Sequence, residues 1–189
     1  MVKELVKKNR SYRRFVESEA IEMDTMRELI ELARFSATGG NQQPIKFMVS
    51  CDPKQNGRIF PTIAWAASLK DWDGPVGGER PTGYVIILGD TEISKGFGVN
   101  HGIAAQSILL GAVEKGLGGC MIGSISRDSL RKELEISERY EILLIVALGK
   151  PGEKVVLEDA EPGGDVTYYR DDEDVHRVPK RTLDELIVG

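Results

Sequence analysis

The sequence predicts an α+β fold in which one sheet is covered by helices. Continuous apolar, β-branched runs at residues 84–88 and 141–149 are typical of buried strands. Residues 24–36 carry apolar side chains at helical spacing, and strands alternate with helices without strict βαβ order. A length of 189 residues is enough to bury one core, so we expect residues 1–189 to form a single domain.

Composition narrows the class of protein. The net charge of −5 gives no reason to expect a nucleic-acid or membrane-surface partner. The apolar stretches are too short to span a bilayer and the N-terminus has no signal-peptide core, so we expect a cytoplasmic protein. Two cysteines and two histidines argue against a disulfide framework and a multi-histidine metal site.

Helix signals open the chain. Residues 3–9 fit a short helix with Leu5 and Val6 on its buried side. Asp24 has the side chain of an N-cap, and the helix that it introduces extends to residue 36. The side chains expected to face the core from this helix are Met26, Leu29, Ile30 and Ala33.

The next segments predict a loop, a strand and a less regular stretch. Paired glycines within residues 37–41 indicate a loop, and residues 44–51 fit a strand. We expect residues 59–69 to be helical, followed by a turn-rich loop at residues 71–75.

A long helix lies between buried strands in the second half. Residues 84–88, 120–123 and 141–149 fit strands, and residues 99–115 are apolar nearly all round. That pattern favours a central helix packed on most of its sides, which Gly116 would end.

The remaining elements are shorter. Ser126 is placed to cap a helix that ends near residue 135, and Thr182 with Glu185 forms a capping box for a final helix. The acidic stretch at residues 154–174 favours a solvated surface segment over a site.

Two basic clusters, at residues 10–14 and 177–181, stand out in an acidic chain. The arginine fork donates two parallel, charge-assisted hydrogen bonds, which suits a phosphate, and Ser11 adds a hydroxyl. A pair of solvated basic turns would have the same local sequence. The clusters therefore predict an anion site only when they are considered together with the rest of the chain.

Two loops invite other hypotheses. Residues 38–44 contain asparagine and glutamine amides, which suit the donor and acceptor edge of a heterocycle, although this loop taken alone favours an ordinary polar turn. Residues 116–123 are glycine-rich, but they follow a helix and lead into a strand, which is the reverse of a dinucleotide fingerprint. We interpret this second loop as a helix end and a tight turn.

The other reactive residue types favour structural roles. Cys120 and Cys51 are expected to be small buried side chains, and His101 a hydrogen-bonded structural histidine. For Trp65 and Trp72, core packing is the first interpretation. The sequence shows no paired-carboxylate, Ser-His-Asp or metal-ligand pattern.

Together, these segments resemble the FMN-dependent nitroreductase family. Residues 9–15 resemble its N-terminal Arg-Arg-Ser-Ile-Arg-x-Phe motif, and residues 33–44 its Ala-Arg…Gly-Asn-x-Gln-Pro motif. Residues 102–118 are similar to its central helix, and residues 178–181 to its C-terminal Pro-Lys-Arg element. The four matches keep the family order, so they favour function over the solvated-turn interpretation.

The resemblance implies a three-layer α/β/α sandwich with a mixed, mainly antiparallel sheet, in an intertwined homodimer with flavin sites at the interface. The helix at residues 99–115 would form the dimer core, and residues 38–43 would reach the flavin of the other subunit. The Gly123 N–H would face flavin N5. The cofactor-binding residues that the resemblance implies are Arg10, Ser11, Tyr12, Arg13, Thr38, Asn41, Gln43, Met121, Ile122, Gly123, Lys180 and Arg181.

The chain also departs from the family pattern. Asn9 replaces the first arginine, Ala37 and Thr38 replace a Pro-Ser pair, and His101 stands where an acidic residue is common. Residues 72–81 match no general family motif and are a candidate substrate lid.

The resemblance implies an FMN-dependent oxidoreductase that transfers reducing equivalents from NADH or NADPH to an electron-poor small molecule, such as a nitro compound or a quinone. A ping-pong flavin cycle needs no side-chain acid or base, which agrees with the absence of a catalytic motif. Three alternatives stay open: a non-catalytic flavin-binding protein, a member with divergent chemistry such as reductive dehalogenation or flavin fragmentation, and a structural dimer.

Overall fold

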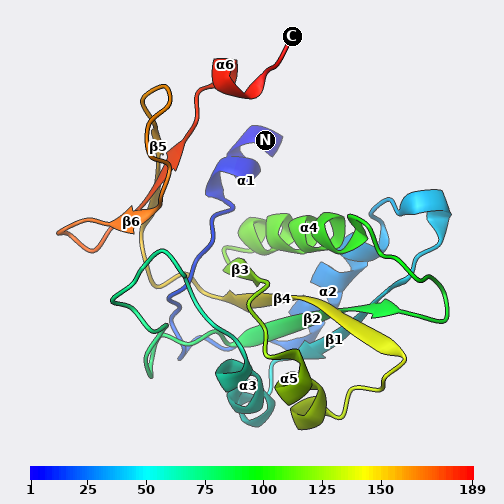
Figure 1. Cartoon of the computed structure of the whole chain (residues 1–189). Helices are drawn as coiled ribbons and strands as arrows, with labels where there is room; N and C mark the ends of the chain where they lie inside the picture. The colour runs from blue at the N-terminus through cyan, green and yellow to red at the C-terminus, as the bar shows by residue number, and fades with distance from the viewer.

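The computed structural model describes all 189 residues and contains two sheets (Figure 1). Its helices and 3₁₀ turns are α1 (Val2–Lys8), α2 (Met23–Arg34), η1 (Gly39–Asn41), α3 (Pro53–Ile59), η2 (Phe60–Thr62), α4 (Asn100–Glu114), α5 (Arg127–Leu134) and α6 (Leu183–Leu186). Its strands are β1 (Ile45–Ser50), β2 (Gly83–Asp90), β3 (Gly118–Ile122), β4 (Tyr140–Gly149), β5 (Val155–Asp159), β6 (Tyr169–Arg170) and β7 (His176–Lys180). The main sheet has the order β1-β2-β4-β3, and the smaller sheet has the order β5-β7-β6.

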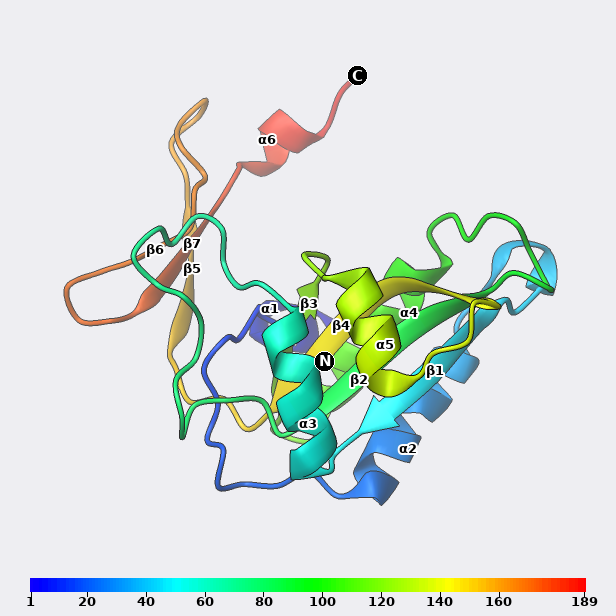
Figure 2. The ribbon, with the colours of Figure 1, turned by 60° about the horizontal axis from the view of Figure 1, so that its bottom comes forward.

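The main sheet is the middle of three layers. Every pair of neighbouring strands in it is antiparallel, and parallel pairing joins β5 to β7 in the smaller sheet. Figure 2 shows α3 and α5 on one face of the main sheet, with α2 and α4 on the other. The α+β class and the mainly antiparallel pairing expected from the sequence are confirmed.

Side chains of strand β2 pack against the helices on both faces of the main sheet. All eight of its residues are buried, and their side chains alternate between the two faces. Ile86 packs in the core cluster that contains Ile59 of α3, whereas Ile87 packs in the cluster that contains Leu29 of α2 and Ile108 of α4. The apolar run of β2 is therefore continuous because both of its faces are covered.

The central helix is confirmed, but its outer side is uncovered. Helix α4 buries Ala105, Ile108 and four other residues against α2 and the sheet. Val99, which precedes the helix, is 73% exposed, and Ile103 is 38% exposed. A single chain therefore leaves some of the apolar side chains at the start of this helix exposed to solvent.

The helix predicted at residues 59–69 is wrong. The structure instead forms α3 earlier, because the Asp52 carboxylate caps it by accepting the Gln55 N–H at 2.8 Å and Pro53 fits its first turn. Pro61 then ends regular helix in the turn η2, and the chain that follows is irregular up to β2.

Two N-terminal expectations are also wrong. Asp24 lies inside the first turn of α2, and Glu22 occupies the cap position without a side-chain hydrogen bond. Helix α1 buries none of its residues, so Leu5 and Val6 do not form a buried side within one chain. The buried positions Met26, Leu29 and Ala33 of α2 were predicted correctly.

The acidic segment at residues 154–174 lies at the surface as expected, since none of its residues is buried, but it also contains regular structure. It forms β5 and β6, and its aspartates pair with arginines close by in the sequence: Asp174 with Arg170 at 3.1 Å, and Asp171 with Arg177 at 2.7 Å. The acidic residues therefore do not all face solvent unpaired.

The C-terminus leaves the body of the molecule. The predicted capping box of Thr182 and Glu185 is confirmed at α6, which lies far from the main sheet (Figure 1). The apolar side chains of this C-terminal segment are exposed, namely Leu183 and Leu186 in α6 and Ile187 and Val188 after it. None of the helices combines the length and apolar character needed to cross a membrane.

Gly119 allows β3 to approach β4 closely. A Cβ atom there would lie 2.5 Å from the Ala147 carbonyl oxygen and 2.7 Å from a methyl carbon of Leu109. The first contact is with backbone in the middle of the sheet, so it has little freedom to move.

We expect Gly119→Ala to lower the free energy of unfolding by about 1–3 kcal/mol, measured by urea denaturation. Gly57→Ala is the matched control, because nothing lies within 4 Å of a Cβ at this helical position. The control should gain about 0.4–1 kcal/mol. Equal stability of Gly119→Ala and the wild-type protein would contradict the close approach.

Candidate functional site

A cavity of about 270 Å³ lies between the N-terminal segment, α4, β3 and β7. Three cations line it, Arg10, Arg13 and Lys180, and no aspartate or glutamate does. The other lining residues are Asn9, Ser11, Gln106, Leu109, Gly119, Met121, Tyr168, His176 and Val178. In a chain with a net charge of −5, this is a local concentration of positive charge suited to an anion.

The N-terminal segment is fixed against β3. Ser11 forms a parallel bridge with Gly119, and the Tyr12 N–H donates to the Gly119 carbonyl at 3.0 Å. The Tyr12 ring packs over Gly118, where a Cβ would lie 2.4 Å from it. Tyr12 therefore anchors the segment rather than lining the cavity, and it holds Ser11 and Arg13 at the cavity wall.

Arg13 is held by an aromatic ring and a histidine. Its guanidinium lies 4.7 Å from the centre of the Tyr168 ring, and Nη1 is 3.3 Å from His176 Nε2. Nη1 also donates to the Ser11 carbonyl at 3.3 Å. Arg13 makes no ion pair within the chain, so its charge remains available to a ligand.

His176 is neutral at this position. Its side chain is buried, and burial, followed by the charges of Arg13 and Arg170, lowers its pKa to about 4. A guanidinium only donates, so Nε2 must be the acceptor and Nδ1 must carry the proton. Nδ1 is buried without a hydrogen-bond partner.

Arg10 has unused donor capacity. Its Nη2 donates to the Val6 carbonyl at 2.8 Å, while its buried Nε has no partner. Burial lowers the pKa of Arg10, with Tyr12 acting in the opposite direction. A buried guanidinium nitrogen without an acceptor fits a site built for an anionic group.

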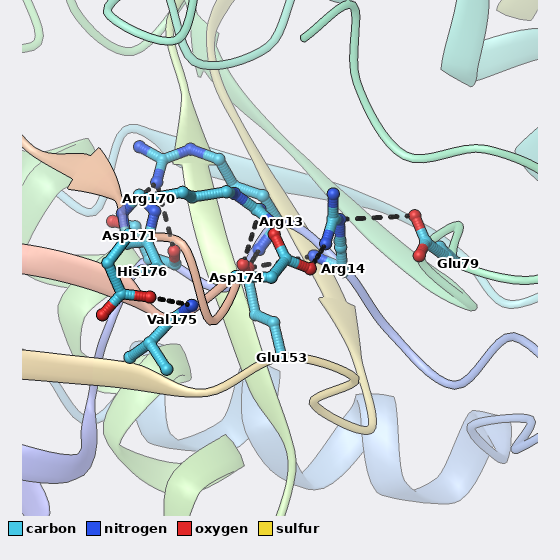
Figure 3. A network of polar contacts seen from close by, with 10 residues as sticks. Arg13, Arg14, Glu79, Glu153, Arg170, Asp171, Asp174, Val175 and His176 are labelled. Carbon is cyan, nitrogen blue, oxygen red and sulfur yellow. Dashed lines mark hydrogen bonds and ion pairs between the residues drawn. The ribbon is translucent and has the colours of Figure 1, made fainter.

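Glu153 organises the charges behind the cavity (Figure 3). Its side chain is 2% exposed, and its carboxylate accepts the backbone N–H groups of Arg13 and Arg14 as well as the Arg170 guanidinium. Asp174 in turn pairs with both Arg14 and Arg170. Glu153 thus binds the backbone N–H of Arg13, Asp174 pairs with the neighbouring arginines, and the Arg13 guanidinium is left to other partners.

A smaller cavity of about 110 Å³ adjoins the first and shares Arg13, Met121 and Tyr168 with it. Residues 64–67 and 120–124 complete its lining. Gly123 follows β3 directly, its N–H donates to no protein acceptor, and a Cβ there would meet nothing within 4 Å. The end of β3 therefore offers a free backbone donor beside an open space.

The predicted residues of the loop near η1 lie elsewhere in the chain. Thr38 and Gln43 line a separate cavity of about 280 Å³, which shares no residue with the cation-lined cavity. The Thr38 hydroxyl accepts the Gln43 N–H at 3.2 Å, and Asn41 and Gln43 have φ values of 53° and 51°. This loop is held in a strained shape by its own contacts, at a distance from the basic cluster.

The structure thus brings together part of the set of cofactor-binding residues that the sequence motifs implied. Arg10, Ser11, Arg13, Met121 and Lys180 line one cavity, and Ile122 and Gly123 line the adjoining one. Arg181 lines neither, because its guanidinium lies 3.5 Å from the Glu185 carboxylate.

Three residues were missed from the sequence, namely Tyr168, His176 and Glu153. All three lie in or beside the stretch that was interpreted as acidic surface. An aromatic residue and a histidine at the ends of an acidic run were the available signal.

Other single-residue expectations have mixed outcomes. Cys120 is buried, and burial raises the pKa of its thiol, as a structural cysteine requires. Trp65 is in the core, but Trp72 is half-buried, with Arg170 at 5.0 Å from its ring. The hydrogen bond expected for His101 is absent, because its buried Nδ1 has no partner within the chain.

Comparisons with known proteins agree on one family. Residues 6–76 and 80–150, together about three quarters of the chain, match the model of the Nitroreductase family. A protein of Bacillus subtilis (strain 168) named as a candidate NAD(P)H nitroreductase, YodC, is 33% identical over 52 residues. That match covers 28% of this chain and 26% of YodC, so it spans about a quarter of that relative.

Solved structures show the same fold. An FMN-dependent nitroreductase from Clostridium difficile R20291 has 22% identity and a TM-score of 0.64, covering 82% of this chain and 89% of that one. A nitroreductase family protein from Streptococcus pneumoniae TIGR4 has 18% identity and a TM-score of 0.72, covering 100% of both chains. The nitroreductase-like fold implied by the sequence motifs is confirmed.

We expect the depressed pKa of His176 to make stability depend on pH. The unfolded chain takes up a proton near pH 6.5 and the folded chain only near pH 4, so stability falls as the pH drops between these values. The loss should approach about 3 kcal/mol, measured by urea denaturation from pH 7 to pH 4. His176→Gln keeps an acceptor for Arg13 but does not titrate, so its profile should be flatter. Parallel profiles for the two proteins would contradict this assignment.

Proposed function

The chain belongs to the nitroreductase family of oxidoreductases, and on that premise we propose that the cation-lined cavity binds FMN. The observation that carries the proposal is the charge of this cavity: three cations line it without a single carboxylate. The fit is supported by the buried, unpartnered Nε of Arg10 and by the unpaired guanidinium of Arg13. A phosphate monoester matches these donors in charge and in geometry.

Each residue of the cavity has a role in holding the cofactor. Arg10, Arg13 and Lys180 would neutralise the phosphate, and Ser11 would add a hydroxyl and a backbone N–H. Tyr168 and His176, which also line the cavity, position the Arg13 guanidinium. The adjoining cavity at the end of β3 would take the ring system, with the free Gly123 N–H as its donor.

When bound, FMN supplies hydride acceptance and donation at N5, so that NADH or NADPH and an electron-poor acceptor such as a nitro compound or a quinone react in turn. The chain has no acid–base pair in these cavities, and its task is to bind, orient and exclude water. Arg13 contributes fixed positive charge, which favours an electron-rich ligand. The backbone of Met121, Ile122 and Gly123 forms the wall against which a planar ring would lie.

A homodimer would complete this site. Thr38, Asn41 and Gln43 lie outside the cation-lined cavity of their own chain, so they are available to a second copy. Apolar side chains are exposed on α1, at the start of α4 and on the C-terminal segment; among them are Val6, Val99, Leu186 and Ile187. Burial of these surfaces between two copies accounts for their apolar character.

We expect the purified protein to show a flavin absorption spectrum, directly or after FMN is added. Arg13→Gln should weaken FMN binding by about tenfold or more, because one charge-assisted contact is lost. Arg58→Gln is the control, since Arg58 pairs with Glu133 at the surface between α3 and α5. A wild-type protein that shows no flavin absorption after FMN is added would refute the proposal.

Anaerobic titration of the loaded protein with NADH and NADPH separates turnover from storage. Bleaching of the flavin by either nucleotide supports the oxidoreductase. A spectrum that neither nucleotide changes favours the flavin-binding protein without turnover.

We expect the double substitution Leu186→Asp and Ile187→Asp to shift the protein from dimer to monomer in sedimentation velocity, because two charges would enter an apolar interface. The FMN content should fall as the dimer is lost, because the monomer lacks the loop that the second copy contributes. Val76→Asp, another exposed apolar position, is the control and should leave both unchanged. A wild-type monomer that retains FMN would rule out the shared site.

A further inference from the structure

A second cavity, of about 260 Å³, lies away from the cation-lined one and shares no residue with it. It is enclosed by α3, the end of β1, the start of β2 and the chain around residues 17–20 and 80–82. Its walls combine apolar surface from Phe60 and two prolines with the side chains of Asn56, Arg80 and Tyr84.

Tyr84 contributes to this cavity a hydroxyl group that makes no hydrogen bond within the chain. The residue is 1% exposed, and its buried hydroxyl has no partner in the chain. Burial raises the pKa of Tyr84 above its usual range, with Arg80 lowering it and Glu17 raising it, so the hydroxyl stays protonated. A buried hydroxyl without a partner costs free energy unless a ligand or solvent satisfies it.

Arg80 brings an unpaired charge. Its guanidinium stacks on Phe60, 4.4 Å from the ring centre, and makes no ion pair within the chain. Glu17 is the one acidic lining residue, and one of its carboxylate oxygens accepts the Gly78 N–H at 2.6 Å and the Arg80 backbone N–H at 3.3 Å. The cavity thus holds an exposed guanidinium without an ion pair, a buried O–H donor without a partner, and one carboxylate, that of Glu17.

Two buried hydrogen bonds fix the Asn56 side chain in the wall of this cavity. The Asn56 amide donates to the Thr82 carbonyl at 2.9 Å and accepts the Ser50 hydroxyl at 2.7 Å, and both bonds are buried. A wall fixed in this way keeps the cavity open and reduces the entropy lost when a ligand binds.

We propose that this cavity binds a small organic carboxylate with a compact apolar body. The carboxylate lies between the Arg80 guanidinium and the Tyr84 hydroxyl, and the apolar body lies against Phe60 and the flanking prolines. A guanidinium and a neutral O–H donor suit a carboxylate, which would pair with Arg80 and satisfy the buried Tyr84 hydroxyl. The cavity volume is near the lower end for small-molecule sites, which limits the ligand to this size.

The test measures binding of cyclohexanecarboxylate to the full-length protein by isothermal titration calorimetry, with the neutral cyclohexanecarboxamide for comparison. We expect the acid to bind at least tenfold more tightly than the amide. Arg80→Gln should weaken binding of the acid by about tenfold or more, whereas Arg58→Gln should not. Tyr84→Phe should weaken binding without lowering the midpoint of thermal unfolding, because it removes an unpaired hydroxyl.

Gly57 provides a variant that blocks the cavity. It lines the cavity, and nothing lies within 4 Å of a Cβ at this position, so Gly57→Leu places a side chain in the open volume. This variant should abolish binding while Gly57→Ala retains it. FMN content should be the same in all of these variants, since none of the residues lines the cation-lined cavity.

Three results would overturn the proposal: no binding to the wild-type protein at millimolar concentration, equal affinity for the acid and the amide, or undiminished binding to Gly57→Leu. A change in flavin absorption on adding the acid that persists in Gly57→Leu would place the ligand at the flavin instead. Failure of the protein to bind FMN would refute the proposed function and leave this measurement interpretable.

Discussion

One buried carboxylate, that of Glu153, joins the two ends of the chain. It accepts two backbone N–H groups of the N-terminal segment and the guanidinium of Arg170 in β6. A charge that is 2% exposed must be paired, so the N-terminal segment and the smaller sheet are held together where they meet. The cation-lined cavity lies between these two parts and depends on their contact.

The same carboxylate determines which charge remains free. Because Glu153 binds the backbone of Arg13, the Arg13 guanidinium is positioned by Tyr168 and a neutral His176. Neither neighbour cancels its charge. A carboxylate in the place of His176 would have formed an ion pair and removed the anion site, so the low pKa of this histidine serves the electrostatics of the cavity.

The two cavities use positive charge differently. The first gathers several cations from distant parts of the chain, which suits a doubly charged phosphate. The second has one free guanidinium, one buried hydroxyl and apolar walls, which suits a smaller, singly charged ligand. Because the two cavities share no lining residue, the two proposed ligands would not compete for the same space.

The sequence by itself determined the buried strands, the central helix and the α6 capping box, because periodicity and caps are local patterns. The five predicted residues that line the cation-lined cavity came from the resemblance of its motifs to a known family, not from local charge. It failed at residues 59–69, where an early cap and a proline outweighed the apolar pattern, and it did not predict that Tyr168, within the surface segment 154–174, lines the site. Only the tertiary structure decided that Glu153 meets Arg13, 140 positions away, and that Tyr168 and His176 enter the site. Such pairings depend on which segments pack together, and local sequence does not encode that.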